Sequence, residues 1–111
     1  MHGDLTVLNL LQDDVGRLLM LDTCGYTGPA EFDAARWSAR TGGAAAATDL
    51  LTAWCRREPE LDRRLANKLL GLELLMEAGV REIVKDERRI DWTVTDSETQ
   101  RLFAVGSELL T

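Results

Sequence analysis

The stretch that decides the fold is HGDLTVLNLLQDDVGRLLMLDT, residues 2–23. Two apolar runs of strand length, 5–11 and 17–22, flank the segment QDDVG at 12–16. Aspartate and glycine favour turns, and glycine disfavours the interior of a helix. The pattern therefore predicts a β-hairpin over 5–22 in preference to one continuous helix.

Downstream of the hairpin the apolar residues recur with helical spacing. Gly42 and Gly43 are expected to separate the first two helices, and Pro59 is expected in the first turn of the third. Gly79 either ends the third helix or marks a break before a further one at 80–89. The helices are predicted over 30–41, 44–57, 60–78 and 96–110.

The third helix carries a stripe of large apolar residues that is expected to face the core. Its members recur at steps of three and four: Leu61, Leu65, Leu69, Leu72 and Met76. Thr95 and Glu98 have the spacing of a capping box and are expected to open the last helix, in which Leu102 is buried. The fold class expected is α+β but mostly α, a hairpin followed by four or five helices.

Composition excludes several classes of protein. The 111 residues suit one domain, and the net charge of −6 disfavours nucleic-acid binding. Charges interrupt every leucine-rich stretch, so no membrane span is expected. His2 is the only histidine, which excludes a multi-histidine metal centre, and Cys24 and Cys55 lack zinc-site spacing. Two such cysteines suit a reducing compartment, and a cytoplasmic protein is expected.

Acidic residues are concentrated in the first third of the chain. Residues 1–33 contain six aspartates and glutamates and a single arginine, Arg17. One interpretation is that turns favour aspartate and the asymmetry is accidental. The other is a site for cations, either a metal ion or a basic substrate.

A constellation of polar residues lies in the same third. His2 and Asp4 form H-x-D, Asn9 follows five positions after Asp4, and Asp22 ends the second apolar run. Phosphoryl transfer needs one carboxylate to orient the attacking hydroxyl. It also needs an amide oxygen and a second carboxylate to hold Mg²⁺ against the nucleotide phosphates.

Residues 2–35 resemble the catalytic and metal-binding segment of the protein-kinase-like fold. Glycine after the histidine distinguishes the stretch from protein kinases, which usually have arginine there. The form HGD is instead similar to that of the aminoglycoside phosphotransferase family of small-molecule kinases. The segment GPAEFDAA at 28–35 is similar to the segment that opens the following helix in that family.

The resemblance implies a role for each residue of the constellation. Asp4 is the catalytic aspartate, and His2 braces its loop. Asn9 and Asp22 bind Mg²⁺, which holds ATP, the phosphate donor. Asp33 is structural, bonding backbone groups near the catalytic loop. One departure is that Thr-Cys-Gly, not Phe-Gly, follows Asp22.

The resemblance also implies a function and its limits. Residues 1–111 are expected to be the C-terminal lobe of a kinase whose N-terminal, nucleotide-binding lobe is absent, so this chain alone is expected to be inactive. The whole enzyme would transfer the ATP γ-phosphate to a hydroxyl of a small acceptor. Family acceptors include aminoglycosides, which implies antibiotic resistance, and the acidic first third favours a cationic acceptor. Self-association through the surface left by the missing lobe is expected. The alternative is a non-catalytic, kinase-derived helical module that binds a partner.

Overall fold

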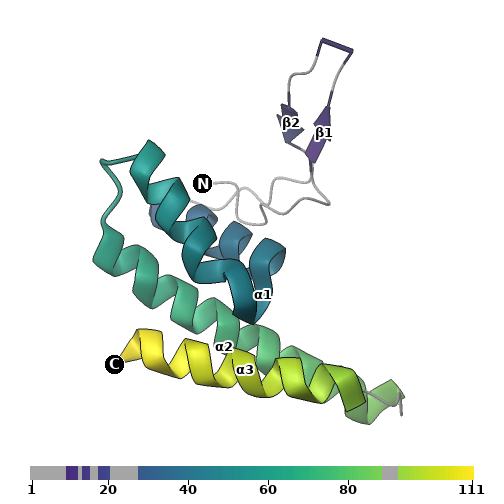
Figure 1. Cartoon of the computed structure of the whole chain (residues 1–111). Coiled ribbons are helices and arrows are strands. Elements are labelled where there is room, and N and C mark those ends of the chain that lie inside the picture. The colour runs from purple at the N-terminus through teal and green to yellow at the C-terminus, as the bar shows by residue number, and fades with distance from the viewer. Residues whose placement is uncertain (1–9, 13, 16–17, 21–27, 89–92) are drawn as a thin grey trace.

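The structure, a computed structural model, describes residues 10–12, 14–15, 18–20, 28–88 and 93–111. Within these residues the chain forms a two-stranded hairpin followed by three helices (Figure 1). The elements in chain order are β1 (Leu10–Gln12), β2 (Leu18–Met20), α1 (Ala30–Arg57), α2 (Arg63–Arg88) and α3 (Thr93–Leu110).

The two strands pair antiparallel. Leu10 lies opposite Met20, and Leu11 lies opposite Leu19. The described part of the stretch that decides the fold is therefore a hairpin and not a helix. In Figure 1, β1 and β2 project away from the three helices, which form the body of the molecule.

Helix α1 begins at Ala30 and turns sharply at Gly43. Gly43 has φ 60° and ψ −158°, a backbone conformation that residues with a side chain rarely adopt. A Cβ at this position would lie 2.9 Å from the Glu98 carboxylate of α3, which accepts a hydrogen bond of 3.0 Å from the Ala44 backbone N–H. Glu98 thus satisfies a free N–H at the start of the second arm of α1.

Three helices are present in the described residues, so the expectation of four or five was wrong. The two arms of α1 are joined at Gly43 within one helical element. Helix α2 continues through Gly79 to Arg88. Gly79 lacks the positive φ that Gly43 has, and a glycine with helical backbone angles is tolerated inside a helix. Helix α3 begins at Thr93, which places Thr95 inside the helix and not at its start.

Helix α2 also begins later than predicted, because Asp62 and not Pro59 sets its start. The Asp62 carboxylate accepts a hydrogen bond of 3.1 Å from the Leu65 N–H, as an N-cap residue does. The Asp62 N–H in turn donates to the Glu31 carboxylate in the first turn of α1, at 2.9 Å. The start of α2 is thereby tied to the start of α1.

The core lies where α2 packs against both α1 and α3. At the crossing of α2 and α3, Gly71 faces Gly106, and a Cβ on Gly71 would lie 3.0 Å from the Gly106 carbonyl oxygen and 2.9 Å from Leu110 Cγ. The two backbones therefore approach more closely than larger residues would allow. The buried apolar residues are Ala34, Ala35, Ala39, Ala47, Leu51, Ala66, Leu70, Leu74, Ala78 and Leu102.

The face of α2 that enters the core is not the predicted stripe. Leu102 of α3 is buried as expected and Leu69 is partly buried, but Leu65 is 37% exposed and Leu72 is 48% exposed. Met76 is also exposed. The core-facing side of α2 instead consists of alanines, leucines and a glycine, which let the neighbouring helices come close. None of the described helices is both long and apolar enough to cross a membrane.

Candidate functional site

Four of the residues expected to carry the chemistry lie outside the described residues: His2, Asp4, Asn9 and Asp22. The nearest described feature is the strand pair in which Leu10 lies opposite Met20. Asn9 directly precedes Leu10 in the sequence, and Asp22 follows Met20 by two positions. The described hairpin therefore reaches the residue next to Asn9 and stops two positions before Asp22.

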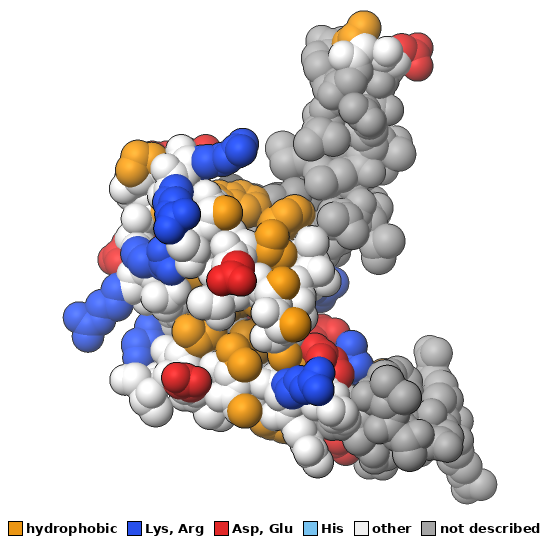
Figure 2. Space-filling model, in the orientation of Figure 1, with side chains coloured by type: hydrophobic (Ala, Val, Ile, Leu, Met, Phe, Trp, Pro, Cys, Tyr) orange, Lys and Arg blue, Asp and Glu red, His pale blue; other side chains and the backbone are white. Residues whose placement is uncertain are grey.

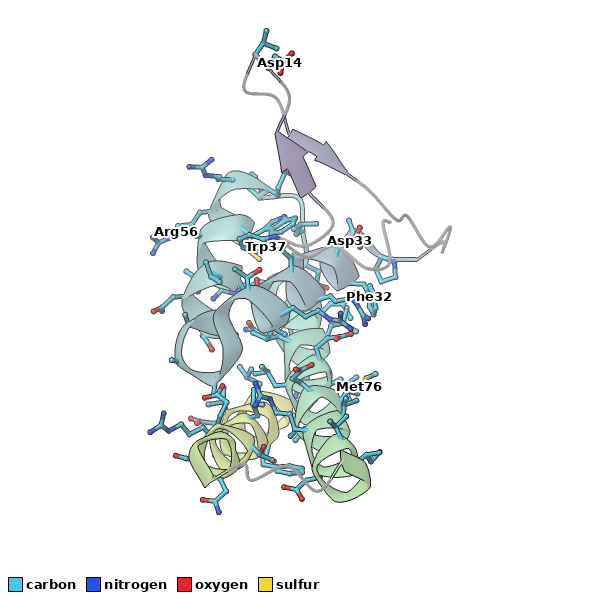
Figure 3. All side chains as sticks on the ribbon, turned by 90° about the vertical axis from the view of Figure 1, so that its right-hand side faces the viewer. Asp14, Phe32, Asp33, Trp37, Arg56 and Met76 are labelled. Carbon is cyan, nitrogen blue, oxygen red and sulfur yellow. The ribbon has the colours of Figure 1, made fainter. Side chains whose placement is uncertain are left out.

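Asp33 lies in the first turn of α1, where it is half-buried. A carboxylate in this position is stabilised by the positive end of the helix dipole. Figure 3 shows Asp33 beside Phe32 on the first turn, whereas Asp14 lies at the far tip of the hairpin. Asp33 therefore lies at the start of α1, away from Asp14 in the turn of the hairpin.

Part of the acidic excess in the first third has a structural explanation. Glu31 accepts the hydrogen bond from the Asp62 N–H described above, so its carboxylate joins two helix starts. The described residues contain no group of three or more histidines, cysteines, aspartates and glutamates that could hold a metal ion. The described acidic residues of the first third therefore lie at a helix start, as Glu31 and Asp33 do, or in the hairpin turn, as Asp14 does.

A ligand-sized pocket lies between the two arms of α1. Its walls include the indoles of Trp37 and Trp54, whose ring centroids are 5.6 Å apart at an interplanar angle of 64°, an edge-to-face arrangement. The pocket has a volume of about 370 Å³ and is open to solvent. Its lining residues are Trp37, Leu50, Ala53, Trp54, Arg57 and Glu58.

Sequence reasoning did not find this pocket. The two tryptophans are 17 positions apart in the sequence and meet because the turn at Gly43 brings the arms of α1 side by side. The available signal was a glycine pair roughly midway between two tryptophans in helical surroundings. In the orientation of Figure 2, apolar side chains gather over the middle of the helical body, with lysines and arginines to their left.

The rim of the pocket carries charge. The pKa of Glu58 is raised above its usual value because its carboxyl shares a hydrogen bond with Glu60 and feels the negative charge of Glu60. The same hydrogen bond lowers the pKa of Glu60. Arg57 and Glu58, which both line the pocket, offer a hydrogen-bond donor and an acceptor next to the indole surfaces. Such an arrangement can hold a ring-containing small molecule with polar substituents.

A buried ion pair fixes the first arm of α1 to α2. Arg36 Nη1 lies 3.4 Å from each carboxylate oxygen of Glu73, and the two side chains are 18% and 8% exposed. The Arg36 guanidinium also lies 5.8 Å from the centroid of the Phe32 ring. Because each charge is compensated by the other, we assign this pair a structural role at the helix contact.

Comparisons with protein-family models, with curated proteins and with solved structures found no match to this chain. The motif of the first third and the geometry of the described residues are therefore the features from which a function can be inferred.

Proposed function

We propose that the chain is the C-terminal lobe of a small-molecule kinase similar to the aminoglycoside phosphotransferases. The whole enzyme would transfer the γ-phosphate of ATP to a hydroxyl of a small acceptor. The observation that carries the proposal is the combination of HGD at 2–4, Asn9, and Asp22 at the end of the second apolar run. Each of these residue types matches a role that phosphoryl transfer requires at that spacing.

The hairpin supports the proposal. Paired residues of an antiparallel hairpin have Cα atoms about 4.5–5.5 Å apart, as Leu10 and Met20 would. A shared metal requires Asn9 and Asp22 to present oxygens about 2.0–2.1 Å from Mg²⁺, with waters and phosphates as its remaining ligands. A hairpin brings Asn9 and Asp22 to the same end of the strand pair. Its register, continued by one pair, would set Asn9 opposite Leu21, so the proposal requires the ladder to end at Leu10 and Met20 for both side chains to reach one ion.

The proposed roles follow from the chemistry of the transferred phosphate. Asp4 orients the acceptor hydroxyl and accepts its proton, and His2 braces the loop that carries Asp4. Asn9 and Asp22 would hold Mg²⁺, which would supply positive charge to the phosphates of ATP. Catalysis of this kind depends mainly on positioning and on electrostatic stabilisation.

The pocket between Trp37 and Trp54 is proposed to receive part of the acceptor. Its volume of about 370 Å³ falls in the range of small-molecule sites. Indole surfaces can stack on the apolar face of a sugar or on another flat ring. Glu58 and Arg57 in the lining can pair with polar substituents of either charge.

The test is a phosphotransfer assay on this chain and on the gene product extended upstream in frame. Both are incubated with Mg²⁺-ATP and a panel of aminoglycosides and other hydroxylated small molecules. We expect no turnover from this chain alone, because a nucleotide-binding lobe is needed to hold adenine and to clamp the phosphates. We expect turnover from the extended product that is lost in Asp4→Ala and kept in Asp14→Asn, the matched change in the hairpin turn.

Turnover by the extended product that survives Asp4→Ala would contradict the proposal. So would an upstream sequence that encodes no nucleotide-binding lobe. Trp54→Ala should raise the KM for the acceptor with little change in the KM for ATP, which separates the pocket from the phosphate-handling residues.

A second candidate function is a non-catalytic helical module that binds a partner. One observation favours it: large apolar residues of α2, among them Leu72 and Met76, remain exposed. The two candidates are distinguished by Asp4→Ala, which abolishes the function of a kinase and leaves that of a binding module unchanged.

A further inference from the structure

A stripe of large apolar side chains runs along the side of α2 that faces away from the core. We call it the outer stripe; its exposed members are Leu65 (37%), Leu72 (48%), Met76 (59%), Val80 (54%) and Ile83 (59%). At about 100° per residue these five positions fall within roughly 80° of one another around the helix. Figure 3 shows Met76 pointing out on the side of α2 away from α3.

The outer stripe has the spacing of a helix–helix seam. Four members of the outer stripe, together with the partly buried Leu69 and with Gly79, are spaced at alternating steps of four and three residues. This spacing is the heptad pattern of paired helices. The seam positions are Leu65, Leu69, Leu72, Met76, Gly79 and Ile83. Apolar residues scattered over a surface would not keep this register over three heptads.

We propose that the outer stripe is a self-complementary interface, by which α2 pairs antiparallel with α2 of a second copy of this chain. In antiparallel pairing about a two-fold axis, each seam residue of one copy lies opposite a different seam residue of the other copy. Leu72 then lies opposite Met76 of the second copy, and Leu65 lies opposite Ile83. Leu69 lies opposite Gly79, where nothing in the described structure comes within 4 Å of an added Cβ, so there is room for a leucine.

Charges at the edge of the outer stripe fit the same orientation. Lys68 and Glu82 occupy equivalent heptad positions on one flank of the seam. Antiparallel pairing brings equivalent flanking positions together, so Lys68 of each copy would face Glu82 of the other. Parallel pairing would not join these two residues. The Lys68 ammonium already donates one hydrogen bond of 2.9 Å to the Leu110 carbonyl, and it has two further N–H groups.

The test is sedimentation of the purified chain over a range of concentrations, with circular dichroism to verify helix content. We expect a monomer–dimer equilibrium. Met76→Glu should weaken association by about tenfold or more, because it buries a charge at the centre of the seam. Val15→Glu, a change at an exposed apolar residue of the hairpin turn, should leave association unchanged.

A charge exchange tests the orientation. Lys68→Glu and Glu82→Lys should each weaken the dimer, and the double variant should restore it, although the double variant still lacks the contact of Lys68 with Leu110. A chain that remains monomeric up to about 1 mM would overturn the proposal, as would dimerisation that is insensitive to Met76→Glu. Weakening by both single variants without recovery in the double variant would overturn the antiparallel arrangement. None of these outcomes depends on the kinase proposal.

Discussion

The two sides of α2 are both apolar, yet only one of them is buried. The inner side presents Ala66, Leu70, Leu74 and Ala78 to α1 and α3, and all four are fully buried. The outer stripe consists almost entirely of large side chains, and it is exposed. Small residues on the inner side let the backbones approach closely, as Gly71 does at the crossing with α3. In α2, both sides are apolar, and the side that enters the core is the one that combines leucines with alanines and Gly71.

The largest expected effect compares two leucines that are two positions apart on α2. Leu70 is fully buried and Leu72 is 48% exposed, on opposite sides of the helix. Leu70→Ala should lower the free energy of unfolding by about 2–5 kcal/mol, because it leaves a cavity in the core. Leu72→Ala should lower it by about 1 kcal/mol or less. Denaturant titration at low protein concentration measures both, and equal effects would contradict the assignment of the two sides.

Two glycines of α2 compare the same two sides of the helix, with smaller expected changes in the free energy of unfolding. Replacement of either glycine by alanine raises helix propensity by a similar amount. A difference between the two changes in stability therefore measures the packing around each position. A Cβ on Gly71 would meet Leu110 and the Gly106 carbonyl at 2.9–3.0 Å, whereas a Cβ on Gly79 would meet nothing within 4 Å. Gly71→Ala should therefore destabilise the fold by about 1–3 kcal/mol.

Gly79→Ala should stabilise the fold by about 0.5–1 kcal/mol, since the methyl group costs nothing sterically. The same denaturant titration measures it. A change of the same sign and size at both glycines would show that the two sides of α2 do not differ in packing.

The smallest expected effect lies at a fully exposed site, the carboxyl pair of Glu58 and Glu60. The raised pKa of Glu58 stabilises the fold at low pH, and this contribution is lost as pH rises through that pKa. The lowered pKa of Glu60 stabilises the fold at higher pH, and this contribution is lost as pH falls through that pKa. The two overlap in a window around the ordinary pKa of glutamate, and solvent screening keeps the net change in stability small.

Carboxyl-carbon NMR titration measures this pair directly. Glu58 should titrate at higher pH than Glu60, and Glu60→Gln should bring the pKa of Glu58 back toward its ordinary value. Coincident titration of the two carboxyls in the unmodified chain would contradict the shared hydrogen bond.

Local sequence signals predicted the elements better than they predicted their packing. Glycine at 43 marked the turn in α1, because its positive φ is a property of the residue itself. The stripe through Leu65 and Leu72 was identified as an apolar face but was assigned to the wrong side of α2. Periodicity reports that a face is apolar and carries no information on how closely a neighbouring helix can approach.

Features that depend on distant residues were not predictable from local patterns. The start of α2 is set by Asp62 together with Glu31, which is 31 positions earlier in the sequence. The pocket between Trp37 and Trp54 arises only when the turn at Gly43 brings the arms of α1 together. The chemistry of the candidate metal site was inferred from residue type and spacing alone, because Asn9 and its partners lie outside the described residues.

The central functional claim is that Asn9 and Asp22 bind one divalent ion at the open end of the hairpin. The most direct measurement is NMR of the chain titrated with Mn²⁺, a paramagnetic substitute for Mg²⁺ that broadens the signals of nearby nuclei. We predict that the amides of Leu10 and Met20 broaden first and that Leu102 in the core is unaffected. Asn9→Ala and Asp22→Ala should abolish the effect without altering thermal unfolding, and Asp14→Asn should preserve it. Broadening centred on Asp14, or unchanged in Asn9→Ala and Asp22→Ala, would contradict the claim.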